Sequence, residues 1–255
     1  MSPVLQDKVA LITGACRGLG KAFALRYAEE GARLLLADIN LEMAEEAARE
    51  IKAKGGEAAA VKTDVSDEKS TQEMAEKVMQ VYGKVDILLN NAGIWKGLEA
   101  VPWDTWKVED WTRILSVNLI GMWLCCKAVA PHMVKAGTGK IVNIASVIAN
   151  VPAAQFFLPY ACSKGGVYTL THSLARSLGS SNINVNAIAP GLTSTEASMT
   201  KAGIDDIYAG ALSEASIARR ESPEDLLGTA VFLASADSDF MTGQVLYVDG
   251  GTVML

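Results

Sequence analysis

The stretch KVALITGACRGLG, residues 8–20, determines the fold class that we expect for this chain. Its first half is a short apolar run with β-branched residues that ends at a glycine, which predicts a buried strand. Its second half is rich in glycine, so the backbone can turn tightly and open a helix whose free N–H groups would meet a pyrophosphate. We therefore predict a dinucleotide site on this turn, formed by Gly14, Arg17, Gly18, Leu19 and Gly20.

The order of strand and then helix continues along all 255 residues. Short apolar runs predict strands at about residues 8–14, 33–38, 57–64, 85–93, 139–146, 182–191 and 243–251. Amphipathic or capped stretches predict helices that end near residue 30 and that span about residues 41–56, 67–82, 108–134, 159–178 and 222–235. This alternation predicts an α/β fold, a single-domain doubly wound (Rossmann) parallel sheet of about seven strands with helices on both faces.

Neither a repeat nor a Pro/Ser-rich linker marks a boundary, so we expect one dinucleotide-binding and catalytic domain over residues 1–255. Residues 194–221 are small, polar and irregular, which favours a mobile substrate lid. In the helix that follows this stretch, we expect Ser222 to be the N-cap and Pro223 to lie in the first turn.

Composition excludes several classes of protein. The net charge of −6 and the lack of a basic run argue against a nucleic-acid-binding surface. The N-terminus lacks a signal-peptide pattern, and we expect no membrane span because no run of about 18 apolar residues stands out. Four cysteines and two histidines show no metal-ligand spacing, so we expect no metal site, and unpaired thiols favour the reducing cytoplasm.

Asp38 and Arg17 point to different cofactors. Asp38 ends the second predicted strand, where a carboxylate can accept hydrogen bonds from the ribose hydroxyls of NAD and would repel the extra phosphate of NADP. Arg17 could pair with that phosphate. We expect NAD, because an arginine can swing into solvent while a strand-end carboxylate cannot easily leave.

The stretch YACSK, residues 160–164, places a phenol and an ammonium four residues apart. A free tyrosine keeps its proton until about pH 10. On a helix these positions share one face, and Lys164 would lower the pKa of the Tyr160 phenol by stabilising the phenolate. The pair could therefore act as a general base, although two residues that share a helix face without any function have the same spacing.

Seven motifs in this order resemble the short-chain dehydrogenase/reductase family in its single-domain form. The resemblance covers residues 7–251 and includes TGACRGLG at Thr13, DV at Asp64, NNAG at Asn90, Asn118, Ser146, YACSK at Tyr160 and PGLTST at Pro190. It implies that Tyr160 is the general acid/base and that Lys164 lowers its pKa and holds the nicotinamide ribose. It also implies that Ser146 donates a hydrogen bond to the substrate oxygen, and that Asn118 holds a water of a proton relay.

The resemblance implies the remaining cofactor contacts as well. Adenine would lie against Asp64 and Val65, while the rest of the cofactor would lie against Asn90, Ala92, Gly93, Pro190, Gly191, Thr193 and Thr195. Two departures alter the expected walls of the substrate pocket. Ser146 and Tyr160 are fourteen residues apart, one more than the family's commonest spacing, and the segment from Gly93 to Asn118 is longer than in compact members.

Aromatic residues gather around the predicted site. We expect Trp95, Phe156, Phe157 and Met199 to line a substrate pocket, and Trp103, Trp106 and Trp111 to pack the loop that carries them. Such a pocket favours an apolar, cyclic or aromatic secondary alcohol or its ketone. The segment TSTEAS, residues 193–198, is similar to aromatic secondary-alcohol dehydrogenases such as 1-phenylethanol dehydrogenase.

We therefore expect an NAD-dependent oxidoreductase that interconverts an apolar secondary alcohol and its ketone. One alternative is a 3-oxoacyl thioester reductase, which usually uses NADPH, and another is a non-catalytic nucleotide-binding subunit. The long predicted helices carry more apolar surface than one layer over a sheet needs, and the resemblance implies a homotetramer.

Overall fold

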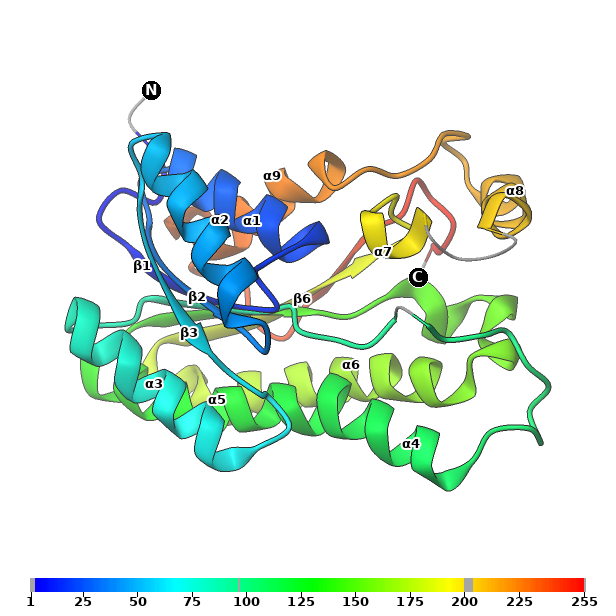
Figure 1. The fold of residues 1–255 in the computed structure, drawn as a ribbon, viewed down its shortest axis with the longest axis horizontal. Helices are drawn as coiled ribbons and strands as arrows, with labels where there is room; N and C mark the ends of the chain where they lie inside the picture. Colours follow the sequence, from blue (N-terminus) through cyan, green and yellow to red (C-terminus); the bar gives the residue numbers. More distant parts are fainter. Residues whose placement is uncertain (1–2, 96, 200–203, 255) are drawn as a thin grey trace.

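The computed structural model describes residues 3–95, 97–199 and 204–254, and seven parallel strands in it form one sheet in the order β3-β2-β1-β4-β5-β6-β7. The sheet lies between two layers of helices (Figure 1). The strands are β1 (Val9–Thr13), β2 (Arg33–Asp38), β3 (Glu57–Lys62), β4 (Ile87–Asn90), β5 (Gly139–Ile144), β6 (Ile183–Pro190) and β7 (Val245–Val248). The predicted doubly wound sheet with helices on both faces is therefore confirmed.

The helices divide between the two faces of the sheet. One layer contains α1, α2 and α9, the opposite layer contains α3, α4, α5 and α6, and α7 and α8 lie at one end of the sheet (Figure 1). The bounds are α1 (Gly18–Glu29), α2 (Leu41–Ala53), α3 (Glu68–Tyr82), α4 (Val108–Leu115), α5 (Gly121–Ala136), α6 (Leu158–Leu178), α7 (Glu196–Met199), α8 (Ile204–Glu214) and α9 (Glu224–Ala234).

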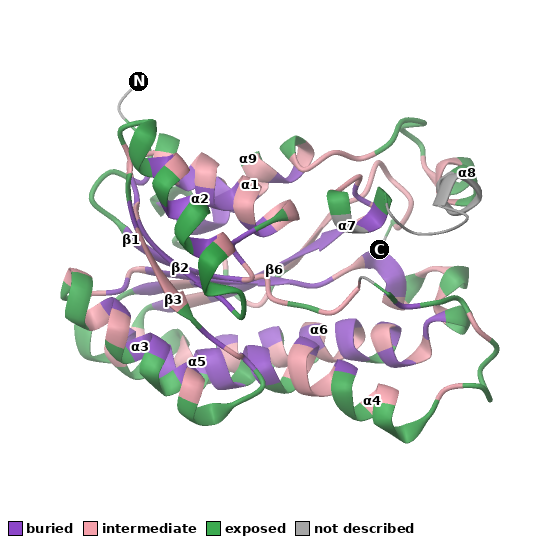
Figure 2. Ribbon diagram, viewed as in Figure 1, coloured by how far each residue is buried: buried purple, intermediate pink, exposed green. Residues whose placement is uncertain are grey.

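The strands are apolar on both faces because both faces are covered. Along β1, Ala10 and Ile12 pack into the core beneath α1 and α9, while Val9 and Leu11 pack into the core beneath α3 and α5. Figure 2 shows the same arrangement, with buried residues along the strands and on the inward sides of the helices. Within one layer, the buried Tyr27 hydroxyl donates to the Ala230 carbonyl oxygen at 2.9 Å and joins α1 to α9.

One helix was predicted over residues 108–134, but the chain forms α4, a π-helical turn at Ser116–Ile120, and then α5. A π turn inserts one extra residue into a helix and is frequent at functional sites. The continuous stretch Val108–Ala136 is also long and apolar enough, with a mean hydropathy of 1.6, to pass a composition test for a membrane span. We expected no such run from the sequence, and 56% of this window is buried inside the protein, as in the core helix of a folded domain.

Two expectations about the segment before α9 need correction. Pro223, not Ser222, is the N-cap of α9, and the Asp225 carboxylate accepts the Ser222 N–H at 2.9 Å. Asp225 thus satisfies the N–H that precedes the helix, and Pro223, which has no side-chain acceptor, does not cap the first turn as the serine hydroxyl was expected to. Residues 200–203 of the predicted lid lie outside the described residues, and its described parts, residues 194–199 and 204–221, are also less irregular than expected, because they contain α7 and α8. Their role as a mobile lid stays a prediction.

Candidate active site

The predicted site residues follow the carboxyl ends of six neighbouring strands, so the parallel sheet brings them to one edge. Strand order reverses between β1 and β4, and ligands of doubly wound sheets bind at such a point. The glycine turn follows β1, Asp38 ends β2, Asp64 follows β3, the NNAG motif begins at the end of β4, Ser146 follows β5, and Pro190 ends β6.

The glycine turn has the shape that a pyrophosphate needs. Gly14 and Gly18 have positive φ angles of 63° and 53°, which side chains disfavour. A Cβ at Gly20 would lie 2.0 Å from the Gly14 carbonyl oxygen, so nothing larger than glycine fits there. No side chain caps the N-terminus of α1, whose first N–H groups therefore face the turn. These features fit a dinucleotide phosphate.

Thr13 and Asn91 fasten this turn to the loop after β4. The Asn91 amide donates to the carbonyl oxygens of Thr13 and Gly14 at 3.1 and 2.9 Å. The Thr13 hydroxyl oxygen accepts the N–H groups of Asn91 and Ala92, both at 3.1 Å. We assigned neither residue a role from the sequence, although Asn91 lies within the NNAG motif.

Asp38 is held in place and Arg17 is not. Asp38 is only 8% exposed, and its two carboxylate oxygens accept the Cys16 N–H at 3.2 Å and the Asn40 N–H at 3.0 Å. Burial, with a further contribution from Asp38, raises the pKa of the Cys16 thiol to about 12. Arg17 is exposed. The residue that favours NAD is therefore fixed beside the glycine turn.

Asp64, Val65 and Asn90 have partners within the protein. Asp64 accepts the N–H and hydroxyl of Ser66 at 2.9 and 2.6 Å, and Val65 is buried beside α5. The Asn90 amide donates to Asn143 Oδ1 at 3.0 Å in the core between β4 and β5. Contact of these residues with a cofactor stays a prediction.

Asn118 occupies the middle of the π turn and is fully buried. Its Oδ1 accepts the Ile94 N–H at 2.7 Å, and its Nδ2 donates to the Ile94 carbonyl oxygen and to Ser163 Oγ, both at 3.2 Å. Asn118 thus joins α4 and α5 to the loop after β4 and to α6. A Cβ at Gly93 would lie 3.4 Å from Asn118 Oδ1 and 3.8 Å from Lys164 Nζ, so Asn118 and Lys164 approach each other across this glycine.

Tyr160, Lys164 and Ser146 come together as expected, but their electrostatics differ from the expectation. Burial raises the pKa of Tyr160 to about 12, against the lowering effect of its hydrogen bond with Ser146. Burial also lowers the pKa of Lys164 to about 8. Lys164 Nζ donates to the Ile144 carbonyl oxygen at 2.7 Å and lies 5.8 Å from the centre of the Tyr160 ring. Ser146, rather than Lys164, therefore makes the contact that lowers the pKa of the phenol.

Tyr168 holds the backbone of Ser146, and we assigned Tyr168 no role from the sequence. Its hydroxyl donates to the Ser146 carbonyl oxygen at 2.6 Å. The Tyr168 ring packs edge-on against Tyr247, with ring centres 6.1 Å apart, and Tyr247 in turn accepts a hydrogen bond from Asn150 at 3.0 Å. Tyr168 lies two helical turns after Tyr160 on α6, which is the sequence signal that could have identified it.

The predicted pocket residues divide into two pairs. Trp95 packs at a tilt against Phe157 and Tyr160, with ring centres 5.3 and 5.0 Å apart, so an aromatic wall borders the phenol. Phe156 and Met199 are 44% and 45% exposed, and their place in a pocket stays a prediction. Among the other tryptophans, Trp106 packs against this apolar cluster as expected. The same expectation was wrong for Trp103, which is 73% exposed.

The loop after β6 is fixed by a residue far along the chain. The Glu221 carboxylate accepts the Gly191 N–H at 2.9 Å and the Thr193 hydroxyl at 2.6 Å. The Thr195 N–H donates to Ser198 Oγ at 2.8 Å. No sequence signal pointed to Glu221, which is 30 positions from Gly191.

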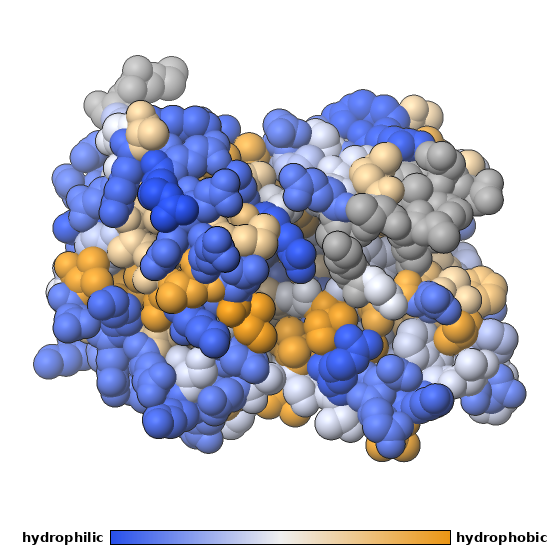
Figure 3. Space-filling model, viewed as in Figure 1, coloured by the Kyte–Doolittle hydropathy of each residue, from blue (hydrophilic) through white to orange (hydrophobic). Residues whose placement is uncertain are grey.

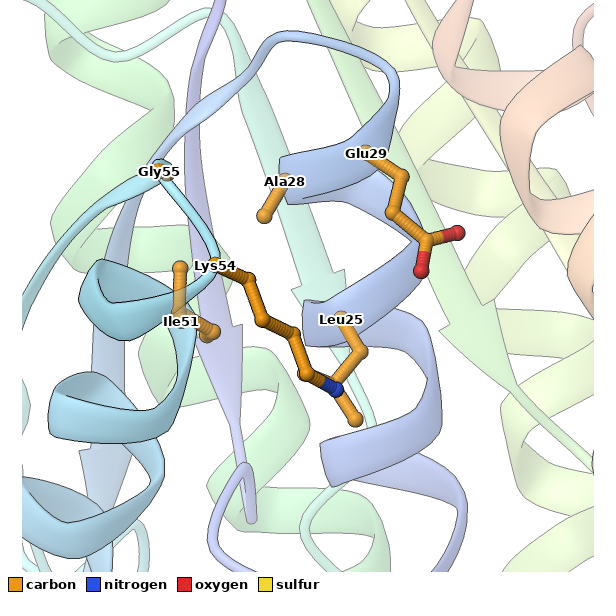
Figure 4. A pocket seen from close by; sticks show the side chains of 7 residues that line it. Leu25, Ala28, Glu29, Ile51, Lys54 and Gly55 are labelled. Carbon is orange, nitrogen blue, oxygen red and sulfur yellow. The ribbon is translucent and has the colours of Figure 1, made fainter.

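Two cavities elsewhere contain none of the predicted site residues. One of about 170 Å³ lies between α1 and α2, and Figure 4 shows the Lys54 side chain extending from α2 toward Leu25 of α1. Lys54 forms an ion pair with Glu50 at 3.1 Å. Over the parts of the chain that the structure describes, no group of three or more His, Cys, Asp or Glu side chains could hold a metal ion.

Comparison with known proteins agrees with this geometry. A family model described as enoyl-(acyl carrier protein) reductase matches residues 14–253. The chain is 38% identical over 250 residues to a 3-oxoacyl-[acyl-carrier-protein] reductase of Thermotoga maritima, covering 98% of this chain and 99% of the relative. The chain belongs to the short-chain dehydrogenase/reductase family.

Of two further relatives of this short-chain dehydrogenase/reductase, one is named for a different substrate and the other is named only for its family. A (2S)-[(R)-hydroxy(phenyl)methyl]succinyl-CoA dehydrogenase subunit of Thauera aromatica is 38% identical over 247 residues, 97% of each chain. A short-chain type dehydrogenase/reductase from Mycobacterium marinum has the same fold, with a TM-score of 0.92 and 33% identity over 100% of this chain and 98% of that one. The chain is therefore an oxidoreductase of this family.

Proposed function

We propose that this oxidoreductase interconverts the ketone and the secondary alcohol of a 3-oxoacyl-type thioester and uses NAD(H). The observation that carries the reaction type is the contact between Tyr160 and Ser146 at the edge of the sheet, beside the aromatic ring of Trp95. When bound, the nicotinamide gives a hydride to the ketone or takes one from the alcohol.

The residues of the chain handle the proton. With a pKa raised to about 12 by burial, the Tyr160 phenol keeps its proton at neutral pH and can donate it to a ketone oxygen. Tyr168 holds the Ser146 backbone carbonyl, and the Ser146 hydroxyl oxygen accepts the Ile148 N–H at 3.2 Å, which positions the hydroxyl for the same ketone oxygen. Lys164 and Asn118 approach each other across Gly93, which supports a path that returns a proton toward Tyr160.

Asp38 supports NAD(H) as the cofactor. Its carboxylate is buried, accepts two backbone N–H groups and ends β2 beside the glycine turn. A phosphate placed against it would meet an uncompensated negative charge, whereas ribose hydroxyls would donate to it. Thioester reductases of this family usually use NADPH, so an enzyme with this carboxylate would differ from them in its cofactor.

Two named relatives support a thioester substrate. The Thermotoga maritima relative is named for a 3-oxoacyl group on a carrier protein, and the Thauera aromatica relative for a hydroxylated acyl-CoA. A second candidate, an aryl or cyclic secondary alcohol, is favoured by the packing of Trp95 and Phe157 beside Tyr160. The Thauera substrate contains both a phenyl group and a thioester, so the two candidates share chemistry.

We also propose that the enzyme self-associates as a homotetramer. Ile120 of the π turn and Trp123 and Val134 of α5 are each more than 40% exposed. Apolar residues also form a band between the helical layers on the face shown in Figure 3. Exposed apolar patches of this kind mark association surfaces. Light scattering after size-exclusion chromatography should give four times the mass of one chain.

The test is turnover with NADH and NADPH on 3-oxoacyl-CoA, aryl ketone and cyclic ketone substrates. We expect the highest kcat/KM with 3-oxoacyl-CoA and NADH. Tyr160→Phe should abolish turnover, while Tyr82→Phe, the same change at a remote hydroxyl bonded to the Leu34 carbonyl oxygen, should not. Preference for NADPH would refute the role of Asp38, and activity on aryl ketones alone would replace the first substrate class with the second.

A further inference from the structure

The Glu221 carboxylate is directed at the loop that follows β6. Its Oε2 accepts the Gly191 N–H at 2.9 Å, and its Oε1 accepts the Thr193 hydroxyl at 2.6 Å. Its backbone carbonyl oxygen accepts the Ser194 N–H at 2.8 Å, and Thr193 and Glu221 pair as a short parallel bridge. One residue therefore fixes the start of the PGLTST segment through both its side chain and its backbone.

Glu221 packs closely against the loop backbone. A Cβ at Gly191 would lie 2.7 Å from Glu221 Oε2 and 3.2 Å from the Asp249 Cα, so the loop backbone lies directly against the carboxylate. Ser198 continues the support on the other side, because its hydroxyl donates to the Thr193 carbonyl oxygen at 2.8 Å. The Thr193 side chain and backbone thus have separate partners, and Glu221 holds the side chain.

The charges around Glu221 are mostly negative. Asp225 at the start of α9 and Asp249 after β7 both disfavour its ionised form. Arg219 is one nearby cation, and it is engaged by Asp225 through two contacts of 2.6 Å. Burial, the largest effect, and the two aspartates raise the pKa of Glu221 to about 7, although the hydrogen bonds from Thr193 and Gly191 oppose this shift. Its protonation state therefore changes within the physiological range.

A carboxylate can accept both hydrogen bonds at once, whereas a neutral carboxyl group has one oxygen occupied by its own proton. Protonation would remove one of these two acceptors. The Gly191 N–H would keep a second acceptor, the Val248 carbonyl oxygen at 3.1 Å, whereas the Thr193 hydroxyl would have to give up its bond or accept the new carboxyl proton. The present arrangement of Thr193 thus depends on the ionised form of Glu221.

We propose that Glu221 is a positioning residue whose ionised carboxylate holds residues 191–195 in the arrangement that binds the nicotinamide cofactor. This inference rests on the proposed function only through the assignment of that loop to the cofactor. Protonation of Glu221 releases the loop, so cofactor affinity falls as the pH falls. Burial, with smaller contributions from Asp225 and Asp249, places the transition near neutral pH.

The experiment measures the dissociation constant of NADH, by nucleotide fluorescence, on the full chain between pH 6 and 8.5. If only the ionised form binds, affinity should weaken about tenfold from pH 8 to pH 6. Glu221→Gln, which imitates the neutral carboxyl group, should bind weakly at every pH with no such transition. Glu224→Gln removes a carboxylate from an exposed position nearby and should keep the wild-type profile.

A second variant tests whether Glu221 acts through its charge or only by stabilising the fold. Asp225→Asn removes a negative charge beside Glu221 and frees Arg219, so it should move the midpoint to lower pH. A midpoint that stays in place, or a Glu221→Gln variant that keeps the wild-type transition, would overturn the proposal. The test needs no turnover, so a pH-dependent affinity without ketone reduction would refute the proposed substrate and leave this inference intact.

Discussion

We expect Asn118→Ala to destabilise the fold by an amount that its three hydrogen bonds predict. The side chain is fully buried in the π turn and bonds to both the N–H and the carbonyl oxygen of Ile94 and to Ser163 Oγ. Removing it leaves the Ile94 N–H without an acceptor, which costs about 1–3 kcal/mol, and each of the other two bonds contributes about 0.5–1.5 kcal/mol. Ser163 keeps a partner, since its hydroxyl also donates to the Tyr160 carbonyl oxygen. The free energy of unfolding should therefore fall by about 3 kcal/mol.

Guanidinium unfolding at one fixed protein concentration measures this loss, because association would otherwise change the apparent stability. The midpoint should move with little change in slope, and Tm should fall by roughly 6–12 °C for a chain of this size. Asn118→Asp keeps an acceptor for the Ile94 N–H but turns a buried carboxylate oxygen toward the Ile94 carbonyl oxygen, so its loss should be at least as large.

A loss below about 1 kcal/mol would refute the reasoning, since it would mean that the π turn holds its position without these bonds. Turnover measured at low temperature then separates the two roles of Asn118. If kcat collapses while stability is unchanged, Asn118 acts in the proton path that the family resemblance implies. If both fall, the structural contacts are a sufficient explanation.

Three further changes test the site. Gly20→Ala would place a methyl carbon 2.0 Å from the Gly14 carbonyl oxygen, so unfolding midpoints should show a loss of at least about 2 kcal/mol and NADH titration a loss of binding. Lys164→Met removes a buried ammonium whose pKa burial lowers to about 8, so it should raise stability at pH 7 by about 1–3 kcal/mol while abolishing turnover. Between about pH 8 and 10 the unfolded wild-type chain binds more protons than the folded one, so wild-type stability rises with pH and the gain of the variant should shrink. A variant that is less stable than the wild type at pH 7 would contradict this reasoning. Trp95→Ala removes the ring 5.0 Å from that of Tyr160, so KM for the ketone should rise about tenfold while NADH affinity stays constant.

The local pattern of the sequence determined the order of the elements and the edge of the sheet that carries the chemistry. Strand and helix periodicity are properties of neighbouring residues, and the glycine turn fixes the backbone wherever it occurs. Parallel strands then place their carboxyl ends together. The common edge of Asp38, Ser146 and Pro190 could therefore be predicted from the strand order in the sequence, before the packing was known. The i, i+4 spacing likewise put Tyr160 and Lys164 on one helix face.

Only the tertiary structure determined what these residues touch and how strongly they hold their protons. Lys164 bonds to the Ile144 carbonyl oxygen, and burial moves its pKa and that of Tyr160 in the directions that disfavour charge. The π turn at Asn118 and the reach of Glu221 to Thr193 were equally absent from the local pattern. The physical reason is common to all of them. Desolvation and hydrogen-bond partners depend on segments that are distant in the chain, and these segments meet only when the sheet and both helical layers pack together.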